Sequence, residues 1–225
     1  MSKEKLTLFK DNITKSEYKN RMEQLTSKID EGEDALKLLL LGTITPELYS
    51  KYGSYKVGQH CRCAGLVNDS FTEKRLCKCM YYYNADYPKK CDKCDIDFRY
   101  KLEGDYKIVD YEVPAFYYGD HIGEIDLIIG DGETLYATEV KPYQGNNETL
   151  LRMVAEIMTY TIGYPAGKYK KAIAFFEHDL EKQITPQNKE YMQKDLDMQE
   201  LLKKADITVF QFEKVNEDTY RLCRL

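Results

Sequence analysis

The chain has 225 residues, of which 43% are hydrophobic and 32% are charged, and its formal net charge is −5. This composition excludes a disordered chain and fits one globular domain, or one domain with an insertion. No apolar run approaches the ~18 residues that a membrane-spanning helix needs, and the charged N-terminal segment lacks the apolar stretch of a secretory signal. We therefore expect a cytoplasmic protein with no membrane contact.

Residues 1–54 are predicted to be N-terminal helices. Apolar side chains recur at helical spacing over residues 14–41, where Gly32 is expected to separate two helices and Gly42 to end the second. Pro46 is typical of the first position of a helix, which predicts a further short helix there.

Residues 55–99 are expected to form a small insert held together by metal. Six of the seven cysteines lie within this stretch, and cysteines in a cytoplasmic chain stay reduced, which favours metal binding over disulfides. The two Cys-x-Cys pairs could each ligate through both sulfurs if the backbone is extended, because side chains two residues apart then point the same way. Cys91 and Cys94 have the standard zinc spacing. The candidate ligands are Cys61, Cys63, Cys77, Cys79, Cys91 and Cys94.

One structural Zn²⁺ is the leading interpretation of these thiols, with a two-metal cluster and an iron–sulfur cluster as alternatives. The insert is predicted to consist of turns and short strands, too few to fold on a core of their own. It is also locally basic, which suits either phosphate contacts or a solvated surface. Its tyrosines are expected to pack around the metal centre, with stacking on unpaired bases as the alternative. They are Tyr81, Tyr82, Tyr83 and Tyr87.

Two short segments carry the clearest chemical signal. Residues 123–129 (Gly-Glu-Ile-Asp-Leu-Ile-Ile) and residues 136–141 (Tyr-Ala-Thr-Glu-Val-Lys) both have the composition of β-strands. The Asp131-Gly132 step between them is a strong hairpin signal. The sequence therefore predicts an antiparallel strand pair.

Charged residues on this strand pair are predicted to converge. Because side chains alternate along a strand, Glu124 and Asp126 share one face of the first strand, and Glu139 and Lys141 share one face of the second. If the hairpin closes, two carboxylates and an ammonium meet on one side, which suits a divalent cation and a phosphate. The competing interpretation is a solvent-facing sheet on which Asp126 or Glu139 pairs with Lys141.

The remaining chain is predicted to alternate between strands and helices. The expected strands are residues 106–113, 171–176, 207–212 and 219–224, and the expected helices are residues 148–160 and 187–205.

This order of elements and these residues resemble the PD-(D/E)XK nuclease superfamily, in which an antiparallel strand pair carries Asp and then Glu-x-Lys, followed by a helix and a further strand. Asp126 matches the acidic position, and Glu139-Val140-Lys141 matches the triplet. The resemblance covers about residues 106–176.

The chain also departs from the superfamily pattern. Ile125 stands where the name-giving proline would precede the aspartate. Some relatives carry Gln-x-x-x-Tyr on the next helix, where this chain has Glu156 and Tyr160, so only the tyrosine is kept. Glu33 and Glu47 are both candidates for the further acidic residue that relatives place on a preceding helix.

The resemblance implies an α/β fold whose core, over residues 100–225, is restriction-endonuclease-like: a mixed central sheet flanked by helices, with the N-terminal helices packed on it. It implies a Mg²⁺- or Mn²⁺-dependent deoxyribonuclease. Asp126, Glu139 and the backbone carbonyl of Val140 would then hold the metal, and Lys141 would orient the attacking water or stabilise developing charge.

Further expectations concern partners. Glu124 is a further candidate for metal binding. DNA is the implied partner, with RNA as an alternative, and a homodimer would suit double-strand cutting. Tyr160 and Arg152 are candidates for contacts to the nucleic-acid backbone, although packing and solvation are preferred for Arg152. The alternative function is a non-catalytic, zinc-containing nucleic-acid-binding or protein-interaction module.

Overall fold

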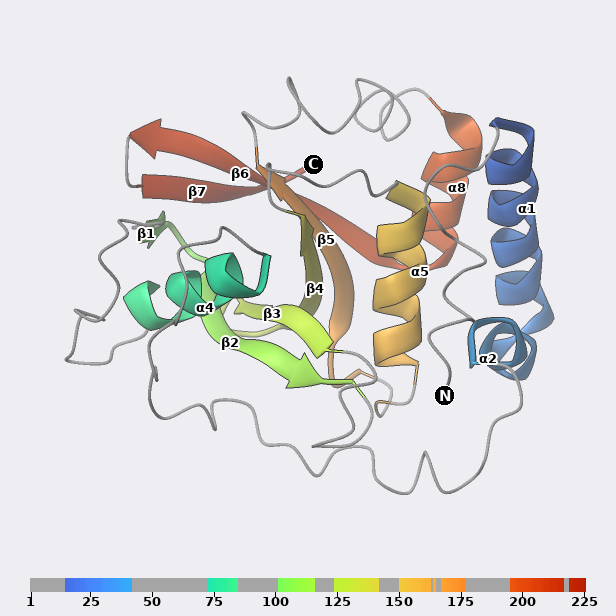
Figure 1. The fold of residues 1–225 in the computed structure, drawn as a ribbon, viewed down its shortest axis with the longest axis horizontal. Helices are drawn as coiled ribbons and strands as arrows, with labels where there is room; N and C mark the ends of the chain where they lie inside the picture. The colour runs from blue at the N-terminus through green and yellow to red at the C-terminus, as the bar shows by residue number, and fades with distance from the viewer. Residues whose placement is uncertain are drawn as a thin grey trace.

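The computed structural model describes residues 15–41, 73–84, 101–115, 124–141, 150–162, 164, 167–176, 195–216 and 219–225 (Figure 1). The helices are α1 (Lys15–Glu31), α2 (Glu33–Leu41), α4 (Glu73–Asn84), α5 (Leu150–Thr161) and α8 (Leu196–Lys204). The strands are β1 (Lys101–Glu103), β2 (Lys107–Pro114), β3 (Glu124–Gly130), β4 (Leu135–Lys141), β5 (Lys170–Phe176), β6 (Ile207–Asn216) and β7 (Thr219–Arg224).

The strands form one mixed, seven-stranded sheet in the order β1-β7-β6-β5-β4-β3-β2. β2, β3 and β4 make an antiparallel meander, whereas β4, β5 and β6 run parallel. α5 provides the crossover from β4 to β5, as parallel neighbours require. β7 returns antiparallel to β6, and β1 joins the edge parallel to β7. The predicted α/β class, with a mixed sheet flanked by helices, is confirmed.

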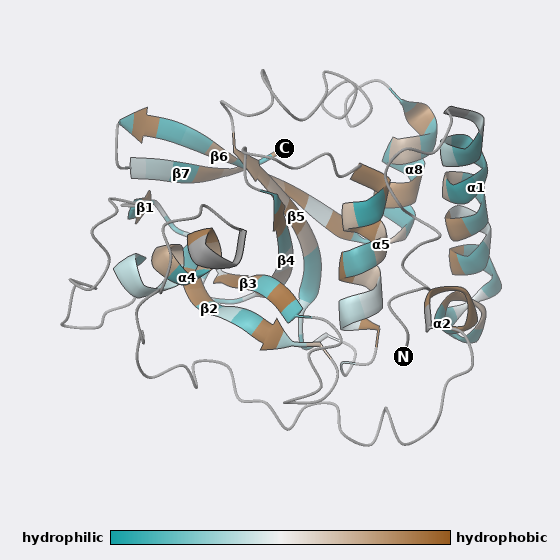
Figure 2. Cartoon of the chain, in the orientation of Figure 1, coloured by the Kyte–Doolittle hydropathy of each residue, from teal (hydrophilic) through white to brown (hydrophobic). Residues whose placement is uncertain are grey.

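Helices cover the two faces of the curled sheet unequally. α5, α8, α1 and α2 lie on one side of it in Figure 1, and α4 lies on the other. The first face packs a mostly aliphatic core from these helices and from β2, β3, β4 and β5. The second face packs aromatic residues of β2, β4, β5, β6 and β7 against α4. In Figure 2 the central strands carry long brown stretches, whereas α1 is largely teal with brown patches.

The N-terminal helices form where the sequence predicts them. Gly32 separates α1 from α2 with φ of 106°, a conformation that glycine adopts without steric cost. α1 packs against α8, and the ammonium of Lys204 on α8 bonds Asp30 of α1 at 2.6 Å. The predicted helix after Pro46 lies outside the described residues. None of the described helices is long and apolar enough to cross a membrane.

Most predicted strands are present, with boundaries that differ by a few residues. β1 was not predicted, because three residues are too short to show alternation. It lies at the sheet edge, where Glu103 pairs in register with Arg221 of β7 and their side chains bond at 2.6 Å. Of the predicted helix over residues 187–205, α8 is the described part. It begins after Asp195, whose carboxylate caps the amide of Met198 at 3.0 Å.

The prediction of turns and short strands for the insert is wrong for residues 73–84, which form α4. Successive residues rotate by about 100° around a helix, so side chains two apart point in different directions. Cys77 is 1% exposed and packs in the core against the sheet, whereas Cys79 is half-buried. The expectation that both sulfurs point the same way from an extended backbone therefore fails for this pair. The other four candidate cysteines lie outside the described residues.

Two of the four tyrosines predicted to pack in the insert are buried, and they pack against the sheet. Tyr81 and Tyr82 are buried, and both rings contact Tyr111 of β2 at centroid distances of 5.2 and 5.7 Å. Tyr83 is exposed, and Tyr87 lies outside the described residues.

The predicted hairpin joins β3 to β4. Gly132 at its tip has φ of 97°, the left-handed conformation that the Asp-Gly signal anticipates. The carboxylate of Asp131 accepts hydrogen bonds from the amides of Glu133 (3.0 Å) and Thr134 (2.7 Å) and from the hydroxyl of Tyr136 (3.2 Å). The two amide bonds hold the pKa of Asp131 below its ordinary value.

Replacing Asp131 with Ala should lower the free energy of unfolding at neutral pH, because the turn amides lose their acceptor. The folded pKa of Asp131 is depressed, so its contribution is full above the ordinary value of about 3.9 and is lost as the pH falls through the folded pKa. Urea unfolding at pH 7 and at successively lower pH should show the difference from wild type shrinking with acidity. Glu133→Ala, at the exposed tip, is the matched control. A difference that stays constant with pH would contradict this account.

Candidate functional site

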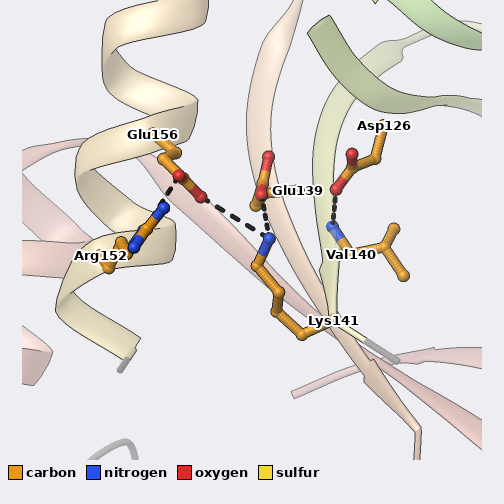
Figure 3. A network of polar contacts seen from close by, with 6 residues as sticks. All are labelled: Asp126, Glu139, Val140, Lys141, Arg152 and Glu156. Carbon is orange, nitrogen blue, oxygen red and sulfur yellow. Dashed lines mark hydrogen bonds and ion pairs between the residues drawn. The ribbon is translucent and has the colours of Figure 1, made fainter. Parts of the chain in front are cut away.

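The candidate site lies where β3 and β4 separate. The last paired residues before this point are Leu127 and Thr138, and the same register places Asp126 opposite Glu139. Asp126 Oδ2 accepts a hydrogen bond from the amide of Val140 at 2.7 Å (Figure 3). In a continuous strand pair, a backbone carbonyl of β3 would accept this bond instead. Asp126 is half-exposed, so solvent reaches this end of the site.

Glu139 and Lys141 meet on the face of the sheet that α5 covers. Their side chains share this face because they are two residues apart on β4. Lys141 Nζ donates to Glu139 Oε1 at 2.5 Å, and the two residues are 4% and 2% exposed. This is a buried ion pair, not the solvent-facing pair of the competing interpretation.

Glu156 of α5 adds a third carboxylate that the sequence analysis did not assign to the site. Its Oε2 lies 3.6 Å from Lys141 Nζ, and its Oε1 accepts from Arg152 Nε at 3.1 Å, one helical turn away. Glu156 is 5% exposed. Figure 3 shows the resulting chain of charges running from Arg152 through Glu156 and Lys141 to Glu139. A buried acid within an apolar helix face was the signal that could have identified it.

Tyr160 lies one turn beyond Glu156 on α5, and the same charged groups shift the pKa of its phenol. Burial raises the pKa of its phenol above the ordinary value, and the negative charges of Glu139, Glu156 and Asp126 raise the pKa further, while Lys141 opposes them. Tyr160 is therefore a neutral hydroxyl beside this cluster of charges. Arg152 forms an ion pair with Glu156, and its side chain is partly exposed.

The oxygen donors of the site suit a hard cation in kind. Mg²⁺ and Mn²⁺ prefer carboxylate and carbonyl oxygens, and Mg²⁺ is commonly held by only one or two carboxylates. Asp126 and Glu139 supply two, beside the backbone of Val140. In the part of the chain that the structure describes, no three His, Cys, Asp or Glu side chains are grouped as a metal-binding cluster. Glu124, at the half-exposed start of β3, does not extend the pair into such a group.

The hollows found among the described residues lie elsewhere. One of about 310 Å³ lies beside α1 and the start of α8, lined by residues such as Tyr18 and Asp195. Another of about 540 Å³ lies between α8 and the ends of β6 and β7. Neither is lined by the charged residues of the site.

No protein family, no curated protein and no solved structure matches the chain.

Replacing Lys141 with Met should destabilise the fold by about 3 kcal/mol, because two buried carboxylates would lose their shared cation. Lys203→Met is the control: Lys203 is exposed on α8, and its loss should cost under about 1 kcal/mol. Urea unfolding followed by far-UV circular dichroism at pH 7 measures both. Equal stability of the two variants would show that Lys141 is not held as a buried ion pair.

Proposed function

We propose that the chain is a divalent-metal-dependent nuclease that hydrolyses phosphodiester bonds in DNA, built on a restriction-endonuclease-like core. The observation that supports this best is the meeting of Glu139 and Lys141 on one face of β4, with Asp126 opposite on β3. The meander, the crossover helix and the parallel strand that follow are the elements the PD-(D/E)XK resemblance implies.

The charge balance of the site supports a cationic cofactor. Among the residues that the structure describes here, three carboxylates, on Asp126, Glu139 and Glu156, face two cations, on Lys141 and Arg152. An excess of negative charge repels a phosphodiester, so a divalent cation is needed before the substrate can approach. When bound, such a cation would supply Lewis-acid activation of water and of the scissile phosphate.

Each charged residue of the site would then have its own role in the reaction. Asp126 and Glu139 hold the cation, and the hydrogen bond from the Val140 amide fixes the orientation of Asp126. The ammonium of Lys141 stabilises negative charge that develops on the phosphate oxygens or orients the attacking water. The half-exposed Asp126 marks the side from which a phosphate enters, because Glu139 and Lys141 are buried.

Cleavage of plasmid and single-stranded DNA by the purified protein should require Mg²⁺ or Mn²⁺ and stop with EDTA. Asp126→Asn and Glu139→Gln should each reduce the cleavage rate at least about 100-fold, because an amide keeps the shape and the acceptor oxygen but not the charge that binds the cation. Glu133→Gln, on the same hairpin but at its exposed tip, should cleave as wild type does.

Cleavage that survives in both variants would reject these residues as the site. Binding of DNA by the wild type without cleavage in any metal would favour the alternative, a non-catalytic zinc-containing binding module. RNA in the same assay tests the other nucleic acid.

The cysteine-rich segment calls for a separate test. We expect purified protein to contain zinc or iron by elemental analysis, and Cys91→Ser or Cys94→Ser to lower both the metal content and the free energy of unfolding. Cys223→Ser, on β7, is the control and should leave the metal content unchanged. A wild-type protein without either metal would overturn the metal-binding interpretation of the insert.

A further inference from the structure

Lys141 is placed between two buried carboxylates at unequal distances. Its Nζ lies 2.5 Å from Glu139 Oε1 and 3.6 Å from Glu156 Oε2. The first distance is a full hydrogen bond, whereas the second is beyond hydrogen-bond range. Among the contacts described, Glu156 Oε2 makes no hydrogen bond, although the atom is buried.

Glu139 would interact with two cations in the proposed site, the ammonium of Lys141 and the divalent metal ion. In the structure its Oε1 is taken by the ammonium of Lys141. A divalent cation bound to the same carboxylate would repel the ammonium at short range and would weaken its bond to Oε1. The ammonium of Lys141 cannot simply lose its partner, because an unpaired charge at a buried position is strongly unfavourable.

Glu156 is a second acceptor near Lys141 among the contacts of the described residues. A movement of about 0.5 Å by Nζ would bring Oε2 into hydrogen-bond range. Glu156 is held in place for this, since Arg152 bonds its other oxygen at 3.1 Å from the preceding turn of α5. Figure 3 shows Glu156 reaching from α5 toward Lys141, on the side away from Asp126.

We propose that Glu156 is a positioning residue that receives Lys141 when a divalent cation engages Glu139. The inference rests on the proposed function, because it needs a cation at Asp126 and Glu139. It goes beyond that function because Glu156 acts by binding Lys141 and does not bind the cation itself. Lys141 then remains charged and beside the site after the cation has bound.

The test is a double-mutant cycle on Mn²⁺ affinity, measured by electron paramagnetic resonance of free Mn²⁺ with the full chain and no nucleic acid. The variants are Glu156→Gln, Lys141→Gln and the pair together. Without Glu156, Lys141 holds Glu139 more strongly against Mn²⁺, so Glu156→Gln should weaken Mn²⁺ binding about tenfold. In the Lys141→Gln background the same change should alter affinity less than about twofold, because the competitor is gone.

An equal loss in both backgrounds would overturn the proposal, since Glu156 would then act on the metal directly or through its charge alone. An unchanged affinity in both would overturn it as well. Should Glu156→Gln not fold, Glu156→Asp keeps the charge but draws the carboxylate back by one methylene group. We expect it to weaken binding about threefold, and wild-type affinity would again overturn the proposal.

Glu139→Gln separates this inference from the proposed function. Mn²⁺ binding that depends on Glu139 but shows no coupling between Glu156 and Lys141 rejects the inference alone. A wild-type protein that binds no Mn²⁺, or binds it equally well as Glu139→Gln, rejects the proposed metal site and the inference together.

Discussion

The buried ammonium of Lys141 is the interaction on which the arrangement of sheet and helix depends. Moving a charge out of water costs several kcal/mol, and the cost is recovered only when opposite charges lie close and in good geometry. Lys141 obtains one carboxylate from its own strand and one from α5. A slip of α5 by one turn would carry Glu156 about 5.4 Å away, so the ion pair fixes the helix against the sheet.

The topology of the sheet explains why the polar residues gather at this point. β4 lies at the change of direction in the sheet, antiparallel to β3 and parallel to β5. Where β3 leaves β4, the amide of Val140 needs an acceptor, and Asp126 provides it. A carboxylate is thereby held beside the buried pair without being buried itself. The site thus combines a rigid, enclosed half with a half open to solvent.

α4, the described part of the cysteine-rich segment, packs on the opposite face of the sheet. α4 packs Cys77 into the aromatic core there, and the side chain of Asn84 joins the end of the helix to β1 by accepting from the amide of Leu102 at 2.7 Å. The acidic network lies under α5 on the other face.

The sequence by itself determined the local elements and the residues of the strand pair. Periodicity predicted α1, α2, α5 and the long strands, the Asp-Gly step predicted the hairpin, and alternation placed Glu139 and Lys141 on one face. Those features depend on neighbours in the chain, which a sequence records directly. It did not determine α4, because the spacing of the cysteines suggested extended pairs while burial of Leu76, Cys77 and Met80 against the sheet favoured a helix. Nor did it assign Glu156 to the site, since the partner of a buried acid is set by which helix packs over which strand. That choice is made by long-range packing, and only the tertiary structure decided it.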